Sequence, residues 1–494
     1  VLKSPFSLTL DRVGLQADTF ALDQFDSEGK IHGGGRLAWA RSRADSVAAA
    51  DRPLAFNLSF TRLPIHEWLR FYRADTKATG TTDGSLQITG TAGEPLIQLQ
   101  AEINDLRYAG TRIDKLSGSF AYADHEINAR VDASQLGRRV LAGNGRIPMD
   151  LGFVPLGNRR LNRPLDFSIR ADSMPVAIVT GVARGFREVQ GSVSGNMLLR
   201  GTTVDPAIAG NLTVKNAAGT FTPSGVRYHD INGTFAVLND SLVNVSASGR
   251  AGDGTAVVFG GLNFARLSDP KFDSLRITMT NFQAASRRDA EFTTTGDLLL
   301  GGRYSAPVLS GNIQIDRGAL YLDELYRQYQ VVELDRALLF DVVDTSVVSI
   351  RRALPESSSP FVKNLRVRDL IVDIGRESWL RSRNLNVEVV GVLEVVFDRA
   401  AEDLRLTGEL SAVRGQYQME YRPLTARRFD IRSGTVEFPG TPGIDPNLDF
   451  QALYRARPLQ NQSDPINIIA SVGGTLPSPR IRLSSEEDQR LSES

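Results

Sequence analysis

The amino-acid sequence predicts a long, repetitive, all-β protein with a few short helices. Apolar and polar residues alternate in runs such as Ile97-x-Leu99-x-Ala101-x-Ile103 and Leu275-x-Ile277-x-Met279. Such alternation places apolar side chains on one face of a sheet and polar side chains on the other. The 494 residues include 44 glycines, many of them at turn-like intervals between these runs. Related segments also recur along the chain, which is typical of a repeat protein.

Further alternating runs support strands throughout the chain. They include Phe56-x-Leu58-x-Phe60, Leu86-x-Ile88, Phe167-x-Ile169, Ile313-x-Ile315 and Val387-x-Val389. Helical periodicity is confined to short stretches, of which the clearest are residues 65–72 and 176–186. Each follows a proline, Pro64 or Pro175, a residue that favours the first turn of a helix.

A repeat of roughly one hundred residues is marked by glycine and proline. The three clear copies open at Gly84, Gly195 and Gly296, and each contains a second glycine that is followed by a proline at the same spacing. These second positions are Gly90 with Pro95, Gly201 with Pro206 and Gly302 with Pro307; Gly474 with Pro479 repeats the pair, and a degenerate copy opens at Gly391, where Leu404 replaces the proline. Proline lacks an N–H group, so we expect it in a connection or at an edge rather than inside a ladder.

The repeat suggests five successive regions. We expect a partial β repeat over residues 1–51, β repeats over 52–163, 164–271 and 272–360, and a distinct C-terminal β region over 361–494. Each repeat supplies about six to eight strands and buries its ends against its neighbours. The stretches 40–53, 148–164 and 344–360 interrupt the alternation, and we expect them to be excursions from the sheet.

Composition excludes several classes of protein. Net charge is zero, with 57 basic and 57 acidic residues, so no overall field attracts nucleic acid. The chain has no cysteine, which excludes disulfides and thiolate metal sites. No run approaches the ~18–20 apolar residues of a membrane helix. Because the chain begins at Val1, we expect a fragment from which any N-terminal anchor is missing.

Catalytic and metal motifs are not found in the sequence, and we expect neither an enzyme nor a bound cofactor or metal. The four histidines, His32, His66, His125 and His229, lack metal-ligand spacing. The segment 191–195 (GSVSG) has valine at the position of a nucleophile, so it is not a nucleophile elbow. A glycosidase-type pair of carboxylates stays open from sequence alone.

Three stretches between Leu370 and Ser485 resemble the C-terminal region of the TamB family, the translocation and assembly module proteins of the diderm cell envelope. They are Asp373 to Gly391 (DIGRESWLRSRNLNVEVVG), Leu406 to Tyr417 (LTGELSAVRGQY) leading to Phe429 to Phe438 (FDIRSGTVEF), and Val472 to Ser484 (VGGTLPSPRIRLS). Residues before about 360 resemble TamB and AsmA-like repeats only in their general sequence pattern.

The resemblance implies an elongated, twisted, open β-groove, a sheet curled like a taco with an apolar interior. It also implies a periplasmic location in a protein anchored in the inner membrane by a segment missing here. The implied role is to carry phospholipid or other acyl lipids to the outer membrane, with an outer-membrane β-barrel partner in some lineages. Roughly 30 strands at ~4.8 Å would span about 140 Å.

Apolar residues of the alternating runs are the candidate lining of this groove. They are Leu86, Ile88, Ile97, Leu99, Met197, Leu199, Leu212, Val214, Ile277, Met279, Leu298, Leu300, Ile313, Ile315 and Leu410. The same alternation also fits a closed β-sandwich whose apolar face is filled core. Two further functions stay open: a scaffold that assembles outer-membrane β-barrel proteins through strand edges, and polysaccharide binding or cleavage.

Overall fold

The computed structural model describes residues 6–11, 13–23, 28–39, 50–66, 78–108, 111–154, 159–180, 185–266, 269–323, 360–422, 425–443, 445–456, 466–475 and 478–485. The described chain is all-β apart from the short helices α3 (Val176–Thr180) and α5 (Pro360–Lys363). It divides into two compact units. Unit 1 comprises residues 1–219, 230–245 and 263–268, and unit 2 comprises residues 220–229, 246–262 and 269–494.

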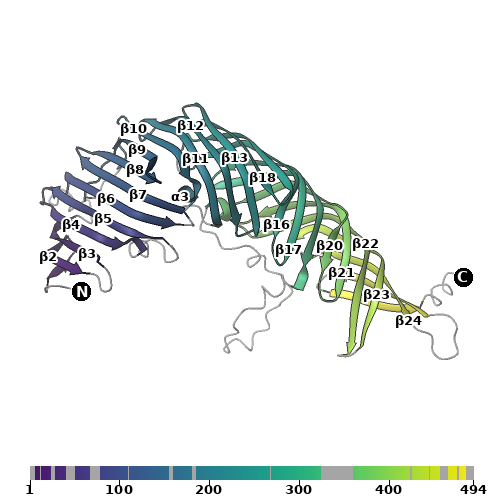
Figure 1. Ribbon diagram of the computed structural model, residues 1–494. Helices are drawn as coiled ribbons and strands as arrows, with labels where there is room; N and C mark the ends of the chain where they lie inside the picture. The colour runs from purple at the N-terminus through teal and green to yellow at the C-terminus, as the bar shows by residue number, and fades with distance from the viewer. Residues whose placement is uncertain are drawn as a thin grey trace. The chain divides into compact units, whose positions relative to one another are not determined.

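Unit 1 contains a run of neighbouring antiparallel strands. These strands are β1 (Leu8–Leu10), β2 (Gly14–Asp23), β3 (Lys30–Ala38), β4 (Ala55–Pro64), β5 (Thr79–Gly90), β6 (Pro95–Tyr108), β7 (Thr111–Ala123), β8 (Glu126–Gln135), β9 (Arg138–Pro148), β10 (Asp166–Pro175) and β11 (Phe186–Gly201). Each pairs with the next in the chain. Figure 1 shows β4 to β9 side by side in one layer.

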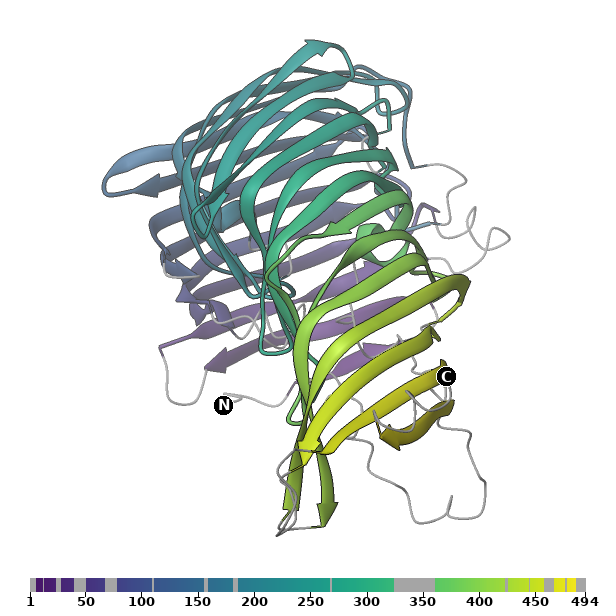
Figure 2. The ribbon, with the colours of Figure 1, turned by 90° about the vertical axis from the view of Figure 1, so that its right-hand side faces the viewer.

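Strands β12 (Pro206–Phe221), β13 (Val226–Asn239), β14 (Leu242–Ala251) and β15 (Gly254–Asn263) contribute residues to both units. Unit 2 continues with β16 (Lys271–Ser286), β17 (Ala290–Arg303), β18 (Ala306–Tyr321), β19 (Arg366–Ile374), β20 (Ser378–Arg381), β21 (Leu385–Asp398), β22 (Asp403–Arg422), β23 (Thr425–Pro442), β24 (Asn447–Ala456), β25 (Ile466–Thr475) and β26 (Ser478–Ser485). Figure 2 shows the long green and yellow strands of this unit arched along their length.

Parallel pairing interrupts the antiparallel order of unit 2 at β18. Both β19 and β20 run parallel to β18, and both pair antiparallel with β21. The two short strands therefore lie end to end in one strand position, separated by the turn at Arg376 and Glu377. Parallel strands need a crossover connection, and here it must lead from Tyr321 back to the opposite end of β18.

The glycine–proline pair of the repeat forms the same hairpin in each clear copy. Gly90, Gly201 and Gly302 have φ of 82°, 82° and 81°, a region that favours glycine. The proline lies directly opposite the glycine in the pairs Gly90–Pro95 and Gly302–Pro307, as the first residue of β6 and the second residue of β18. In the first two copies a threonine closes the turn, because the N–H groups of Thr91 and Thr202 donate to carbonyl oxygens three residues later. We expected the proline in a connection or at an edge, and the structure places it within a paired strand, at the end of the ladder.

A β-bulge with an equivalent hydrogen bond precedes each clear copy of the repeat. One residue of the preceding strand adopts positive φ, and its N–H group donates to the side chain just before the opening glycine. The pairs are Arg62 with Asp83 Oδ1 (3.0 Å), Ser173 with Ser194 Oγ (2.9 Å) and Asn281 with Thr295 Oγ1 (2.9 Å). Register shifts occur at these same places in β4, β10 and β16. Bulges of this kind bend a strand and increase its twist.

The strands predicted from alternation are confirmed in β4, β5, β6, β10, β16, β18 and β21. The helix predicted over 176–186 begins at Val176 as expected, but it is wrong at its far end because Phe186 already opens β11. Ile65 and His66 are helical, and residues 67–72 of the other predicted helix lie outside the described residues. Of the expected excursions, residues 40–49, 155–158 and 344–359 also lie outside them. The described residues between β9 and β10 form only isolated bridges, Met149 with Arg160 and Pro164 with Thr202.

The opening glycine of a repeat should not tolerate a side chain. At Gly296, with φ of 148°, an added Cβ would lie 2.3 Å from the carbonyl oxygen of Asn312 and 2.7 Å from the Cα atom of Ile313. We expect Gly296→Ala to lower the free energy of unfolding by about 2 kcal/mol or more, through strain and overpacking. Urea unfolding followed by circular dichroism measures this loss.

The matched control is Gly301→Ala in the same strand, where an added Cβ meets nothing within 4 Å. This control should change the free energy of unfolding by less than about 0.5 kcal/mol. Equal effects of the two substitutions would show that close packing at the repeat glycine is unimportant.

Candidate functional site

The candidate lining residues of unit 1 share one face of the sheet. Direct cross-strand partners point to the same side, and Leu86 faces Leu99 while Ile88 faces Ile97. Successive partners form one continuous row across eight strands: Leu58, Leu86, Leu99, Phe120, Ala129, Gly145, Phe167 and Leu199. A second row runs through Phe60, Gly84, Ala101, Gly118, Val131, Gly143, Ile169 and Met197. We call this side of each unit the apolar face and the other side the polar face.

The remaining candidates of unit 1 are in β12. The Cα atom of Leu212 lies 2.9 Å from the position of an added Cβ at Gly195, so these two residues are neighbours across the β11–β12 pair. Gly195 faces Ala171 of β10, which belongs to the apolar face. Because side chains alternate along a strand, Val214 points to the same side as Leu212.

The candidates of unit 2 also share one face. One row of successive partners is Ile277, Leu298, Gly311, Leu370, Val395 and Leu406, and a second is Met279, Gly296, Ile313, Val372, Leu393, Gly408 and Phe438. Leu300 faces Leu275 and Leu309, and Ile315 is linked through Ile374 and Gly391 to Leu410. The apolar rows therefore pass through the parallel pairing at β18 without changing side.

The apolar face is partly open to solvent. Ile88, Met279 and Leu410 are buried at 7%, 8% and 7% exposure, and all the other candidates are half-buried. A residue in the core of a filled sandwich would have apolar neighbours above it as well as beside it. The half-buried state of these rows favours a single curled layer over a filled sandwich.

On the apolar face, several glycines lie opposite large aromatic side chains and leave space for their rings. The Phe60 ring occupies the space that a Cβ of Gly84 would need, and Phe292 and Phe450 do the same over Gly318 and Gly434. Side chains on a face that bends inward crowd one another, so glycine at alternate positions relieves that crowding. The sequence signal for this arrangement is a glycine within an alternating run. From the sequence alone, we assign the glycines only to turns.

Two apolar clusters of unit 1 lie at opposite ends of its strands. One contains Leu54, Ile88, Ala92 and Val154 beside the Gly90–Pro95 hairpin, where the Phe153 N–H donates to the Ala92 carbonyl oxygen (2.7 Å). The other contains Ile113, Val140 and Met174 with Ile178 of α3 packed against it. The two rows described above cross the sheet between these clusters, in its half-buried middle.

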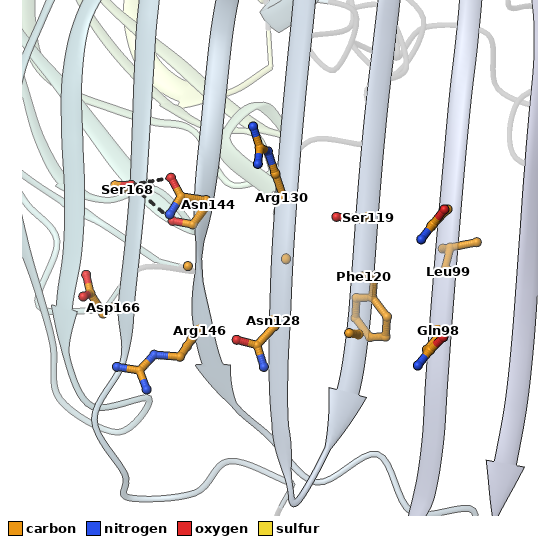
Figure 3. A pocket seen from close by; sticks show the side chains of 14 residues that line it. Gln98, Leu99, Ser119, Phe120, Asn128, Arg130, Asn144, Arg146, Asp166 and Ser168 are labelled. Carbon is orange, nitrogen blue, oxygen red and sulfur yellow. Dashed lines mark hydrogen bonds between the residues drawn. The ribbon is translucent and has the colours of Figure 1, made fainter.

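A hollow of about 680 Å³ lies against strands β6 to β10 of unit 1 (Figure 3). Its lining combines polar and apolar residues: Gln98, Gln100, Ser119, Asn128, Arg130, Asn144, Arg146, Asp166 and Ser168, together with the candidate Leu99 and with Phe120, Ala121, Ala129 and Gly145. Amide, guanidinium and carboxylate groups keep such a hollow wet.

Titratable groups do not assemble into a metal centre within the described residues. No three His, Asp or Glu side chains of that part lie in a metal-binding group. His125 Nδ1 lies 3.3 Å from Asp150 Oδ2, in the turn between β7 and β8. Glu388 is the carboxylate with the clearest structural role: it is 2% exposed and receives a hydrogen bond from the Glu377 N–H (2.9 Å) and another from Arg414 Nε (2.5 Å).

The TamB C-terminal domain family model matches residues 244–492. The chain belongs to the TamB family. The match begins well before Leu370, so the likeness to TamB covers more of the chain than the three sequence stretches indicated. The comparison with curated proteins yields no match.

Membership places this chain in a structural and transport family of the cell envelope. In the part of this TamB chain that the structure describes, none of the helices has the length and apolarity to span a membrane. The groove-lining residues remain a prediction, as do the five-region division and the specific partners.

The pKa of Glu388 is held below its ordinary value of 4.5 by the hydrogen bond from the Glu377 N–H and then by Arg414. The folded chain therefore binds fewer protons than the unfolded chain at moderately acidic pH, and its stability is lost as pH falls through 4.5 toward the lower folded pKa. We expect Glu388→Gln to lower the free energy of unfolding at pH 7 by about 1–3 kcal/mol.

The substitution should also flatten part of the acid-side loss of stability, as urea unfolding between pH 3 and pH 7 would show. Glu394→Gln, at an exposed position of the same strand, is the control and should leave the pH profile unchanged. An identical acid-side profile in wild type and Glu388→Gln would contradict the assignment.

Proposed function

We propose that this TamB chain carries phospholipid or other acyl lipids along its apolar face, between the inner and outer membranes. The observation that carries the proposal is the continuity of half-buried apolar rows across successive strands in each unit. Every backbone group in the middle of a row is paired with a neighbouring strand, so a lipid needs only apolar contact.

Burial of acyl chains is non-directional and stabilises by roughly 0.8 kcal/mol per CH₂ group. Such a surface therefore needs no residue-specific chemistry at any one point, and a lipid can move from one row to the next without losing its contacts. Ala101 and Gly118, which face each other in the middle of unit 1, are small, and an added Cβ at Gly118 would meet no side chain within 4 Å, so this part of the row has room above it for a chain.

Charge on the apolar face should block the transfer of lipid. We expect Met197→Asp with Leu298→Asp to abolish restoration of outer-membrane integrity when the full-length protein is expressed in cells that lack it. A carboxylate on each unit would have to be desolvated beside every passing acyl chain, at a cost of several kcal/mol. Mass spectrometry of lipid that co-purifies with the variant should show a parallel loss.

The matched control is Leu198→Asp with Leu299→Asp. These leucines are the next residues in the same strands and point to the polar face, where Leu198 faces Ser168 and Leu299 is 38% exposed. The control should retain both lipid and activity. Full activity of the Met197→Asp, Leu298→Asp protein, with normal folding, would refute transport along this face.

A second candidate function, assembly of outer-membrane β-barrel proteins, is favoured by one strand. Within the described residues β26 pairs only with β25, and its Ile481 and Leu483 are 55% and 56% exposed. A strand at the end of a sheet can add a strand from a partner. Removal of residues 478–485 would then abolish function while the doubly charged variant of the apolar face kept it.

A further inference from the structure

An arginine–tryptophan cluster lies on the polar face of unit 2, away from the apolar rows. Trp379 of β20 faces Glu388 of β21, which faces Arg414 of β22. The guanidinium carbons of Arg381 and Arg414 each lie 5.4 Å from the centre of the Trp379 ring, within the range of a cation–π contact. Three short stretches of sequence thus meet at one indole.

The cluster carries more positive charge than its own carboxylate neutralises. Glu388 is engaged by Arg414 Nε and by the Glu377 N–H. Arg376 is also close enough to favour the ionised form of Glu388. Arg376 and Arg381 have no carboxylate partner within 4.0 Å among the described residues. Like charges gathered without counter-ions repel one another, so this arrangement is complementary to an anion.

The form of the cluster favours a surface that carries many anionic groups over a single small ion. Arg414 has a side chain that is 69% exposed, so a lone phosphate bound there would stay largely hydrated. The cluster also borders the turn at residues 382–384, which connects β20 to β21 at the ends of these strands. Guanidinium groups match phosphate oxygens in geometry, and tryptophan favours the interface between headgroups and water.

We propose that Arg381 and Arg414, in contact with Trp379, form with Arg376 of the adjoining turn a docking site for the phosphate groups of an anionic phospholipid surface. Arg414 is fixed in place by Glu388, while Arg376 and Arg381 supply guanidinium groups that have no carboxylate partner within 4.0 Å in the part of the chain that the structure describes. This site is separate from the apolar face and does not depend on lipid transport along it.

Binding to vesicles tests the site directly. Wild-type protein should bind vesicles of one-third phosphatidylglycerol and two-thirds phosphatidylcholine, and bind pure phosphatidylcholine vesicles much more weakly. Arg376→Gln with Arg381→Gln should reduce the affinity for the anionic vesicles by about fivefold per guanidinium removed, or about 25-fold together. Arg376→Lys with Arg381→Lys keeps the charge and should retain most of the binding.

The matched control is Arg276→Gln with Arg368→Gln, which removes the same charge from exposed positions of β16 and β19 in unit 2. This control should bind anionic vesicles almost as well as wild type. Circular dichroism and urea unfolding establish that each variant is folded. The single variants Arg376→Gln and Arg381→Gln, each expected to bind about fivefold more weakly, serve as the test if the double variant is not.

Three outcomes would overturn the proposal. They are equal binding of wild type to the two kinds of vesicle, an equal loss in the cluster and control variants, and retention of inorganic phosphate in dialysis without binding to anionic vesicles. Full activity of the Met197→Asp, Leu298→Asp protein would refute the transport proposal but would not affect these vesicle results. Failure of the transport proposal is therefore distinguishable from failure of this one.

Discussion

Cross-strand register is the constraint on which the rest of each unit depends. A slip of one residue at any pair would move every later apolar side chain to the polar face. The rows through Leu86 and Leu99 in unit 1 and through Leu298 and Gly311 in unit 2 persist over many strands only because such slips are absent or compensated. Where the register does shift, at a bulge, the extra residue takes positive φ and the alternation resumes on the correct side.

Glycine serves three separate needs in this sheet. Gly302 permits the tight hairpin, Gly296 permits the close approach of the next strand, and Gly318 leaves room for the ring of Phe292. The first need belongs to the connection, whereas the other two belong to the sheet itself. A protein that curls one layer without a second layer to fill it must remove side-chain volume from the face that bends inward.

Much of the fold follows from local sequence, and much of the polar detail does not. Alternation is a local property, so the strands and the shared face of residues such as Ile97 and Leu99 were predictable. The bulge residues Arg62, Ser173 and Asn281 are chemically unlike, so only the polar residue before each repeat glycine could have signalled them. The contact of Trp379 with Arg414 depends on the register of three strands, which no local pattern specifies.

The parallel pairing at β18 has a consequence for how unit 2 forms. Hairpins such as β17–β18 close over a few residues, so each can add to its predecessor at small entropic cost. The β18–β19 pair instead joins strands separated by the long connection from Tyr321 to Arg366. Loop closure and contact order both slow such a step. Unit 2 should therefore form as two groups of successive hairpins, one that ends at β18 and one that begins at β19. The pairing of these two groups should limit the rate of folding.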